Sequence, residues 1–169
     1  MARLYRRDST YCEPDDIEPK LREAIAAHAQ ACSLGDVLAN TVACCLTVST
    51  RIHKPSLRSR LTGMTDPDPE HRTLALFTPR WLVVTVTRAS TGTTVLSARL
   101  DGVTLAERSA LIARSPRNAQ LPEDTGVSIT AQWSGHGETG SYHVALGDDA
   151  DGEFFLQALR RAVAEAKQG

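Results

Sequence analysis

The sequence predicts a mainly β protein with one helix near each end, and three patterns support this prediction. Residues 74–105 alternate between apolar and polar side chains in four short runs, which is the period of half-buried strands. Turn residues containing Pro, Gly or Asp separate these runs, because such residues favour the backbone angles of tight turns. Beyond residue 147 the apolar spacing becomes helical, which predicts a closing helix.

The first forty residues are expected to hold an arm and one helix. Residues 1–15 are polar and aperiodic, and we interpret them as a tail or an extended arm. A helix is predicted from Glu18 to Cys32, with Pro19 in its first turn and Gly35 after its end. Four residues fall on one face of this helix: Leu21, Ile25, His28 and Cys32.

The segment 41–52 is rich in β-branched residues and alternates, which predicts a long first strand. We expect Cys44 to lie on its buried face and Cys45 on the other face, where the thiol is accessible. The buried face is expected to comprise Val42, Cys44, Leu46 and Val48. The next eighteen residues are expected to form a loop, because Pro67 and Pro69 are incompatible with a helix interior or a central strand.

The rest of the chain completes a set of seven strands. Four strands are predicted within 74–105, and residues 108–125 are expected to form a long connection with a helical turn at 106–113. Residues 126–133 and 142–146 alternate on either side of a glycine-rich turn, which predicts a hairpin. On the closing helix, the apolar face comprises Phe155, Leu159, Ala162 and Ala166. The predicted core comprises Val42, Leu46, Leu82, Val84, Val86, Ile129, Val144 and Leu146, covered by Phe155 and Leu159.

Seven antiparallel strands followed by an amphipathic helix resemble a bacterial pleckstrin-homology-like (PH-like) domain over residues 41–166. The strings that carry the resemblance are LALFTPRWLVVTV, VLSARLDGVTL and FFLQALRRAV, in that order. The resemblance implies a seven-stranded antiparallel barrel or sandwich closed by the C-terminal helix. We therefore expect an N-terminal segment, 1–40, and a PH-like domain, 41–169. The tryptophan that eukaryotic PH domains carry in the closing helix is absent, with Phe154 and Phe155 there instead.

Composition excludes several classes of function. The formal net charge is −1, from 19 basic and 20 acidic residues, so no overall field favours nucleic acid. The apolar runs are far shorter than the roughly 20 residues that cross a bilayer, and no signal-peptide pattern is present. We expect a cytoplasmic protein without a transmembrane segment. Four cysteines without CxxC spacing are expected to be free thiols: Cys12, Cys32, Cys44 and Cys45.

The strongest candidate site is the basic run RIHKPSLRSR after the first strand. Lys54 and the triplet 58–60 resemble the phosphoinositide-binding pattern of PH domains, and guanidinium groups bind phosphate oxygens in pairs. The candidate ligand-binding residues are Arg51, Lys54, Arg58 and Arg60. A solvated loop is the competing interpretation, since Asp66, Asp68 and Glu70 follow closely enough to pair with these cations.

Other chemical patterns are weaker. His28 and Cys32 have the i, i+4 spacing of two zinc ligands, which Cys44 and Cys45 would have to complete, but a packed helix face explains the same spacing. The acidic run GDDADGE lacks the ligand alternation of a calcium loop, so helix capping accounts for it. No catalytic motif, metal site or cofactor is expected.

The sequence thus favours a noncatalytic intracellular binding or scaffold module that engages a protein partner or self-associates. The alternative is a weak anionic ligand or a membrane headgroup bound through residues 51–60.

Overall fold

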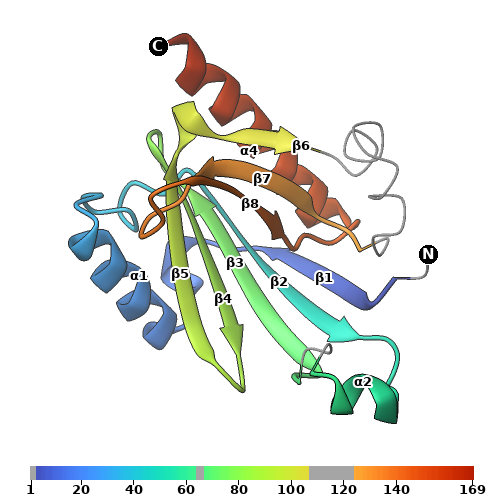
Figure 1. Cartoon of the computed structure of the whole chain (residues 1–169). Helices are drawn as coiled ribbons and strands as arrows, with labels where there is room; N and C mark the ends of the chain where they lie inside the picture. The colour runs from blue at the N-terminus through green and yellow to red at the C-terminus, as the bar shows by residue number, and fades with distance from the viewer. Residues whose placement is uncertain (1–2, 64–66, 107–123) are drawn as a thin grey trace.

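The computed structural model describes residues 3–63, 67–106 and 124–169, without the side chains of residues 59 and 60. Within these ranges the chain forms two antiparallel sheets and three α-helices (Figure 1). The first sheet has five strands in chain order: β1 (Tyr5–Tyr11), β2 (Ala43–Arg51), β3 (Glu70–Phe77), β4 (Trp81–Arg88) and β5 (Gly92–Arg99). The second has three: β6 (Thr104–Ala106), β7 (Val127–Gln132) and β8 (Thr139–Val144). The helices are α1 (Pro19–Ala31), α2 (Leu57–Leu61) and α4 (Ala150–Gln168), with 3₁₀ turns η1 (Pro14–Asp16) and η2 (Leu100–Gly102).

Turn residues that can be recognised in the sequence stabilise the hairpins of the first sheet. In the turn between β3 and β4, the Thr78 amide donates to the Trp81 carbonyl over 2.8 Å. The Thr78 hydroxyl accepts from the Trp81 amide over 3.0 Å, which fixes the turn on both sides. Between β4 and β5, Gly92 has a φ of 75°, a conformation that favours glycine. The strands predicted within 74–105 are thus confirmed, as are the later hairpin and the closing helix.

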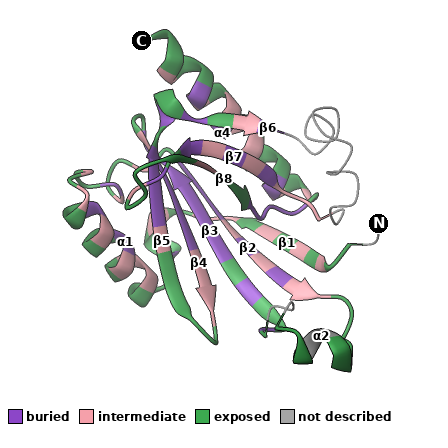
Figure 2. Ribbon diagram, in the orientation of Figure 1, coloured by how far each residue is buried: buried purple, intermediate pink, exposed green. Residues whose placement is uncertain are grey.

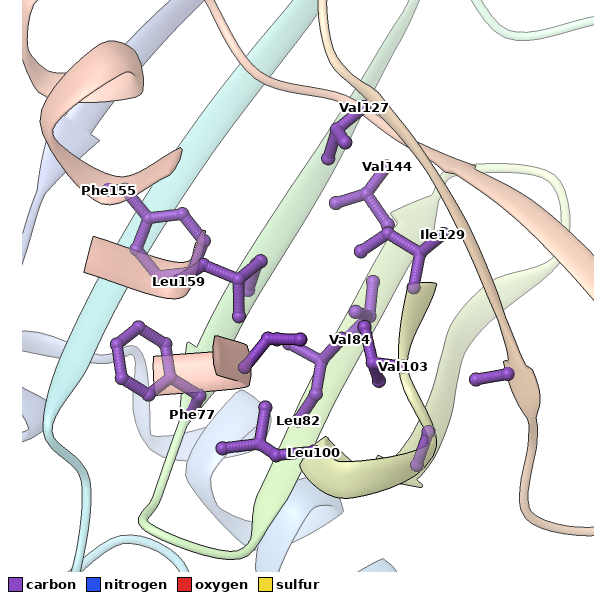
Figure 3. Packing of buried hydrophobic residues seen from close by; sticks show 14 of the residues in the cluster. Phe77, Leu82, Val84, Leu100, Val103, Val127, Ile129, Val144, Phe155 and Leu159 are labelled. Carbon is purple, nitrogen blue, oxygen red and sulfur yellow. The ribbon is translucent and has the colours of Figure 1, made fainter. Parts of the chain in front are cut away.

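The first sheet is covered on both faces. On one face, side chains of β2 to β5 pack against the second sheet and α4. Figure 3 shows this core, formed by Phe77, Leu82, Val84, Leu100, Val103, Val127, Ile129, Val144, Phe155 and Leu159. On the other face, Leu74, Leu76 and Val83 pack against Ile25 and Ala29 of α1. Figure 1 shows α1 on the side of the sheet away from α4.

Burial of both faces overturns the predicted orientation of β2. Cys44 lies on the α1 face and Cys45 lies in the core beneath α4, and both are 0% exposed. The expectation that Cys45 is accessible is therefore wrong. Val42 is 57% exposed, and Leu46 is half-buried beside α1 rather than in the α4 core. Alternation cannot identify the inner face of a strand when both faces are apolar.

The remaining core predictions are largely confirmed. Val86 is only half-buried. The residues predicted correctly for the α4 core are Leu82, Val84, Ile129, Val144, Leu146, Phe155 and Leu159. The helix predicted near the N-terminus is α1, within one residue at each end. The helical turn predicted at 106–113 lies largely outside the described residues.

Residues 5–11, expected to belong to a tail or arm, form the edge strand β1. This strand pairs along its whole length with β2, from Tyr5 opposite Arg51 to Tyr11 opposite Cys45. Its side chains alternate between half-buried and exposed. The strand is polar because an edge position buries little of each side chain, so the sequence carries no apolar period here. The expected separation of segment 1–40 from 41–169 stays a prediction.

The two sheets do not join into a closed barrel within the described ranges, because β5 and β6 belong to different sheets. The predicted fold class is thus confirmed at the level of a mainly antiparallel β protein with a C-terminal and an N-terminal helix. The strand count differs, with eight described strands where seven were expected, since β1 was not anticipated. Helix α4 fills the space beside the first sheet with Phe155 and Leu159, both 0% exposed.

Candidate functional site

The predicted basic residues lie on the segment that joins β2 to β3. Arg51 ends β2, Lys54 follows in the loop, and Arg58 lies on α2. Arg60 is on the same helix, but its side chain is outside the described residues. Lys54 and Arg58 are exposed, whereas Arg51 is half-buried. The structure therefore brings these positions onto one loop, which projects from the sheet on the side away from β6 (Figure 1).

Apolar side chains project from the same loop. Leu57 is 79% exposed and Leu61 is 87% exposed, and Ile52 at the start of the loop is 48% exposed. The two leucines are spaced i, i+4, so they lie on one face of α2. Figure 2 shows the described part of α2 as exposed. The sequence-based site contained the cations alone; the leucine spacing in SLRSRL was the signal that could have added them. We call residues 52–61 the α2 loop.

The acidic residues that follow the loop have other partners in the structure. The Asp68 carboxylate is buried and accepts from the Ser90 amide over 3.1 Å and the Ser90 hydroxyl over 2.6 Å. Glu70 lies 3.5 Å from Arg72 on β3. Asp66 lies outside the described residues. Across the described part of the chain, no ion pair engages the side chains of Lys54 or Arg58. The α2 loop thus combines exposed cations with exposed apolar groups.

A second polar cluster surrounds His28 on α1. Its Nε2 atom lies 2.9 Å from the Ser97 hydroxyl, 3.3 Å from the Ser134 hydroxyl and 3.7 Å from the Cys32 Sγ. Burial lowers the pKa of His28, which favours its neutral form. The Ser97 amide also donates to the Ser134 hydroxyl over 3.0 Å. These bonds connect α1, β5 and the turn after β7.

The cluster adjoins a cavity of about 660 Å³, lined in part by Trp81, Arg99, Trp133 and His136. A Ser–His pair of this kind is one element of a nucleophilic site, which also needs an accessible hydroxyl and a group that orients the imidazole. Ser97 is only 2% exposed. The Ser97 hydroxyl is therefore not accessible as a nucleophile, and its hydrogen bonds connect elements of the fold.

The structure brings together only two of the four residues considered as zinc ligands. His28 and Cys32 are in contact. The Cys44 thiol, however, is hydrogen-bonded to the Cys12 thiol. Cys45 lies in the core on the opposite face of the sheet. Among the described residues, no group of three or more His, Cys, Asp or Glu side chains is arranged to hold a metal ion.

The acidic run before α4 caps the helix, as the sequence predicts. Asp149 is the N-cap, and its Oδ1 accepts from the Gly152 amide over 2.8 Å. Its Oδ2 accepts from the Ser9 amide of β1 over 2.7 Å, and Asp151 accepts from the Tyr11 amide over 2.9 Å. The carboxylates are thus engaged by backbone amides of the helix and of the edge strand.

His143 on β8 lies beside β1. Its Nε2 is 3.2 Å from the Arg7 guanidinium and 3.1 Å from the Thr125 carbonyl. Burial, followed by the nearby positive charge of Arg7, lowers the pKa of His143. His136 lies exposed on the turn after β7.

None of the helices in the described ranges combines the length and the apolar character needed to span a membrane. Comparisons with protein-family models, curated proteins and solved structures found no match for this chain. The arguments for function therefore rest on the site geometry.

Proposed function

We propose that this chain is a noncatalytic intracellular binding module that attaches to an anionic membrane surface through the α2 loop. The observation that carries the proposal is the exposure of Leu57 and Leu61 on a loop with Lys54 and Arg58. An exposed leucine pair is unfavourable in water unless a partner covers it. Cations beside it indicate that the partner surface is negatively charged.

The two kinds of side chain act by different forces. Each basic residue near an anionic bilayer contributes about 1 kcal/mol, and this attraction falls off within a Debye length of about 8 Å at physiological salt. Leucine side chains that enter the interface are removed from water and contribute a term that salt does not screen. Because the loop is short, the sum supports weak, reversible and salt-sensitive attachment.

The sequence alone favours a protein partner or self-association. At the β1 edge of the first sheet, the structure gives this interpretation less support than the α2 loop gives attachment to a membrane surface. A free sheet edge pairs with another strand through unpaired amides. On β1, the amides of Tyr5, Ser9 and Tyr11 already donate to Asp124, Asp149 and Asp151. Addition of a strand at this edge would have to displace three carboxylates.

We further infer that the part of the chain from β2 to α4 is a PH-like domain. Support comes from the order of its elements: four consecutive antiparallel strands in one sheet, three in the other, and a helix against the core between them. In this arrangement the α2 loop is part of the connection between the first two strands of the domain. Strand β1 and helix α1 are additions to this arrangement.

Co-sedimentation with vesicles tests the proposal. The full chain is mixed with vesicles of phosphatidylcholine alone or of phosphatidylcholine and phosphatidylglycerol in equal parts, at low and at physiological salt. We expect sedimentation with the anionic vesicles only, and less of it as salt increases. No sedimentation with anionic vesicles at low salt, or equal sedimentation with both compositions, would contradict the proposal. If the chain binds neither kind of vesicle but captures a specific protein, the protein-partner interpretation is favoured.

A further inference from the structure

Two cysteines lie opposite each other at the edge of the first sheet: Cys12, which directly follows β1, and Cys44 on β2. Tyr11 pairs with Cys45 in the register of β1 and β2, so Cys12 follows opposite Cys44. The Cys12 amide donates to the Cys44 carbonyl over 3.1 Å. The two Sγ atoms are also 3.1 Å apart. The thiols are thus already in contact while both are free.

The backbone geometry of this pair suits a disulfide. Directly opposed residues of antiparallel strands have Cα atoms about 4.5–5.5 Å apart. Disulfides join residues whose Cα atoms are about 4.4–6.8 Å apart. Both side chains lie on the α1 face of the sheet, where Cys44 is part of the core and Cys12 packs against it. A bond between them therefore requires no rearrangement of the strands.

The two thiols differ in their access to solvent. Cys12 is half-buried and lines a cavity of about 550 Å³ between the start of α1 and the sheet, together with Ile17, Leu21 and Leu74. Cys44 is fully buried. A small reagent in the cavity therefore reaches Cys12 and not Cys44.

Cys12, the more accessible thiol, is also the more acidic of the two. The hydrogen bond between the two thiols lowers the pKa of Cys12. The same hydrogen bond, together with burial, raises the pKa of Cys44. Since the thiolate is the nucleophile in thiol–disulfide exchange, reaction begins at Cys12.

We propose that Cys12 and Cys44 form a dithiol–disulfide site that is oxidised by a low-molecular-weight disulfide. The Cys12 thiolate attacks one sulfur of the reagent, forming a mixed disulfide and releasing one thiolate. Cys44, after losing its proton, attacks the Cys12 sulfur, breaks the mixed disulfide and releases the second thiolate. The two cysteines lose two electrons and two protons in total, and the reagent is reduced to two thiols that carry these protons.

The bond would join the edge strand β1 covalently to β2. Between the two cysteines the chain runs through α1, so the disulfide closes a loop that contains this helix. Cross-links of this kind restrict the open and unfolded states. The oxidised protein should therefore open less readily at β1 and α1 than the reduced protein.

Peptide mapping by mass spectrometry tests the site on the full chain. The protein is incubated with oxidised glutathione, treated with an alkylating agent under denaturing conditions and digested. We expect a peptide cross-link between Cys12 and Cys44, with Cys32 and Cys45 alkylated. A cross-link to another cysteine, a bond between two chains, or a wild-type protein that retains glutathione on Cys12 would overturn the proposal.

Variants separate the two steps. Cys44→Ser is expected to retain one glutathione on Cys12, and Cys12→Ser is expected to leave Cys44 unmodified. Cys32→Ser is the matched control and should still form the cross-link, because Cys32 contacts His28 and neither cysteine of the pair depends on it for the bond. Because Cys44 is buried, Cys44→Ala is the second variant if Cys44→Ser does not fold. Hydrogen exchange gives an independent readout: amides of β1 should exchange several-fold more slowly after oxidation, and an unchanged rate would contradict the inferred effect.

Discussion

The Asp149 carboxylate bonds to Ser9 across 140 residues of sequence and so connects the closing helix to the edge strand. Its Oδ2 accepts from the Ser9 amide over 2.7 Å, while its Oδ1 caps α4 at Gly152. The Ser9 hydroxyl in turn accepts from the Gly147 amide over 2.8 Å. A single side chain thus satisfies an amide at the helix terminus and an amide at the sheet edge, two places where backbone donors lack regular partners.

Removal of this connection should destabilise the protein. Loss of an N-cap side chain costs about 0.5–2 kcal/mol, and Asp149→Ala also leaves the Ser9 amide without its acceptor. We expect a loss near the upper end of this range in urea unfolding and faster hydrogen exchange at Ser9. Asp148→Ala is the matched control, because Asp148 is exposed and pairs with Arg3 at the surface. Equal losses in the two variants would contradict the role assigned to Asp149.

Truncation of Leu159 tests the packing of α4 against the sheets. This side chain is 0% exposed in the core that Figure 3 shows. Leu159→Ala should lower the free energy of unfolding by about 2–5 kcal/mol, as large-to-small core substitutions do. Leu57→Ala, at a side chain that is 79% exposed, should change it by less than about 0.5 kcal/mol. A loss well below 1 kcal/mol for Leu159→Ala in denaturant unfolding would show that α4 does not close the core.

The connection through His28 should make stability depend on pH. Burial places the pKa of His28 in the folded protein below its value in the unfolded chain, about 6.5. The unfolded chain therefore binds the proton more readily, and the folded state loses stability as pH falls through 6.5 towards the folded pKa.

The corresponding variant is His28→Asn. The stability advantage of the wild type over this variant should shrink between pH 7.5 and 5.5 in urea unfolding. His143, whose pKa is also lowered, remains in both proteins, so the difference reports on His28. An advantage that grows on acidification would contradict the proposed environment of His28.

The four cysteines should be free thiols without metal under reducing conditions. Protein purified in the presence of reductant but without chelator should contain less than about one-tenth of an equivalent of zinc. Thiol titration after denaturation should count all four cysteines. In the folded protein Cys44 and Cys45 should react more slowly than Cys12 with a thiol reagent, because both are 0% exposed and the pKa of each is raised, that of Cys45 by burial to about 11. Stoichiometric zinc would revive a site at His28 and Cys32.

Most of the fold follows from local patterns. The strands from β3 to β5 and the β7–β8 hairpin have clear alternation and turn residues, and α4 has both a capping residue and an apolar stripe. β1 was not predicted as a strand because its order comes from pairing with β2 and from the Asp149 and Asp151 carboxylates, which are remote in sequence. The orientation of β2 depends on which of its apolar faces packs against α1 and which packs against α4. This choice is made by tertiary packing and not by the local sequence.

The candidate site was predictable in part. The charges of the α2 loop are evident in the sequence, but the exposure of Leu57 and Leu61 is not, because leucines at this spacing usually pack into a core. The Cys12–Cys44 contact was not predictable, since it needs the register of a strand that the sequence did not reveal. Both features depend on where β1 and α2 lie in the fold.

The partition of variants between buffer and anionic vesicles tests the central claim most directly. Lys54→Gln with Arg58→Gln should weaken binding by about 30-fold, as expected for two cations at about 1 kcal/mol each. Leu57→Ser with Leu61→Ser should also weaken binding, and the residual binding should be more sensitive to salt. The matched controls are Arg161→Gln with Lys167→Gln on α4, and the exposed Val42→Ser. We predict that both loop variants lose binding and both controls keep it; loop variants that bind as the wild type does, or controls that lose as much, would contradict the account.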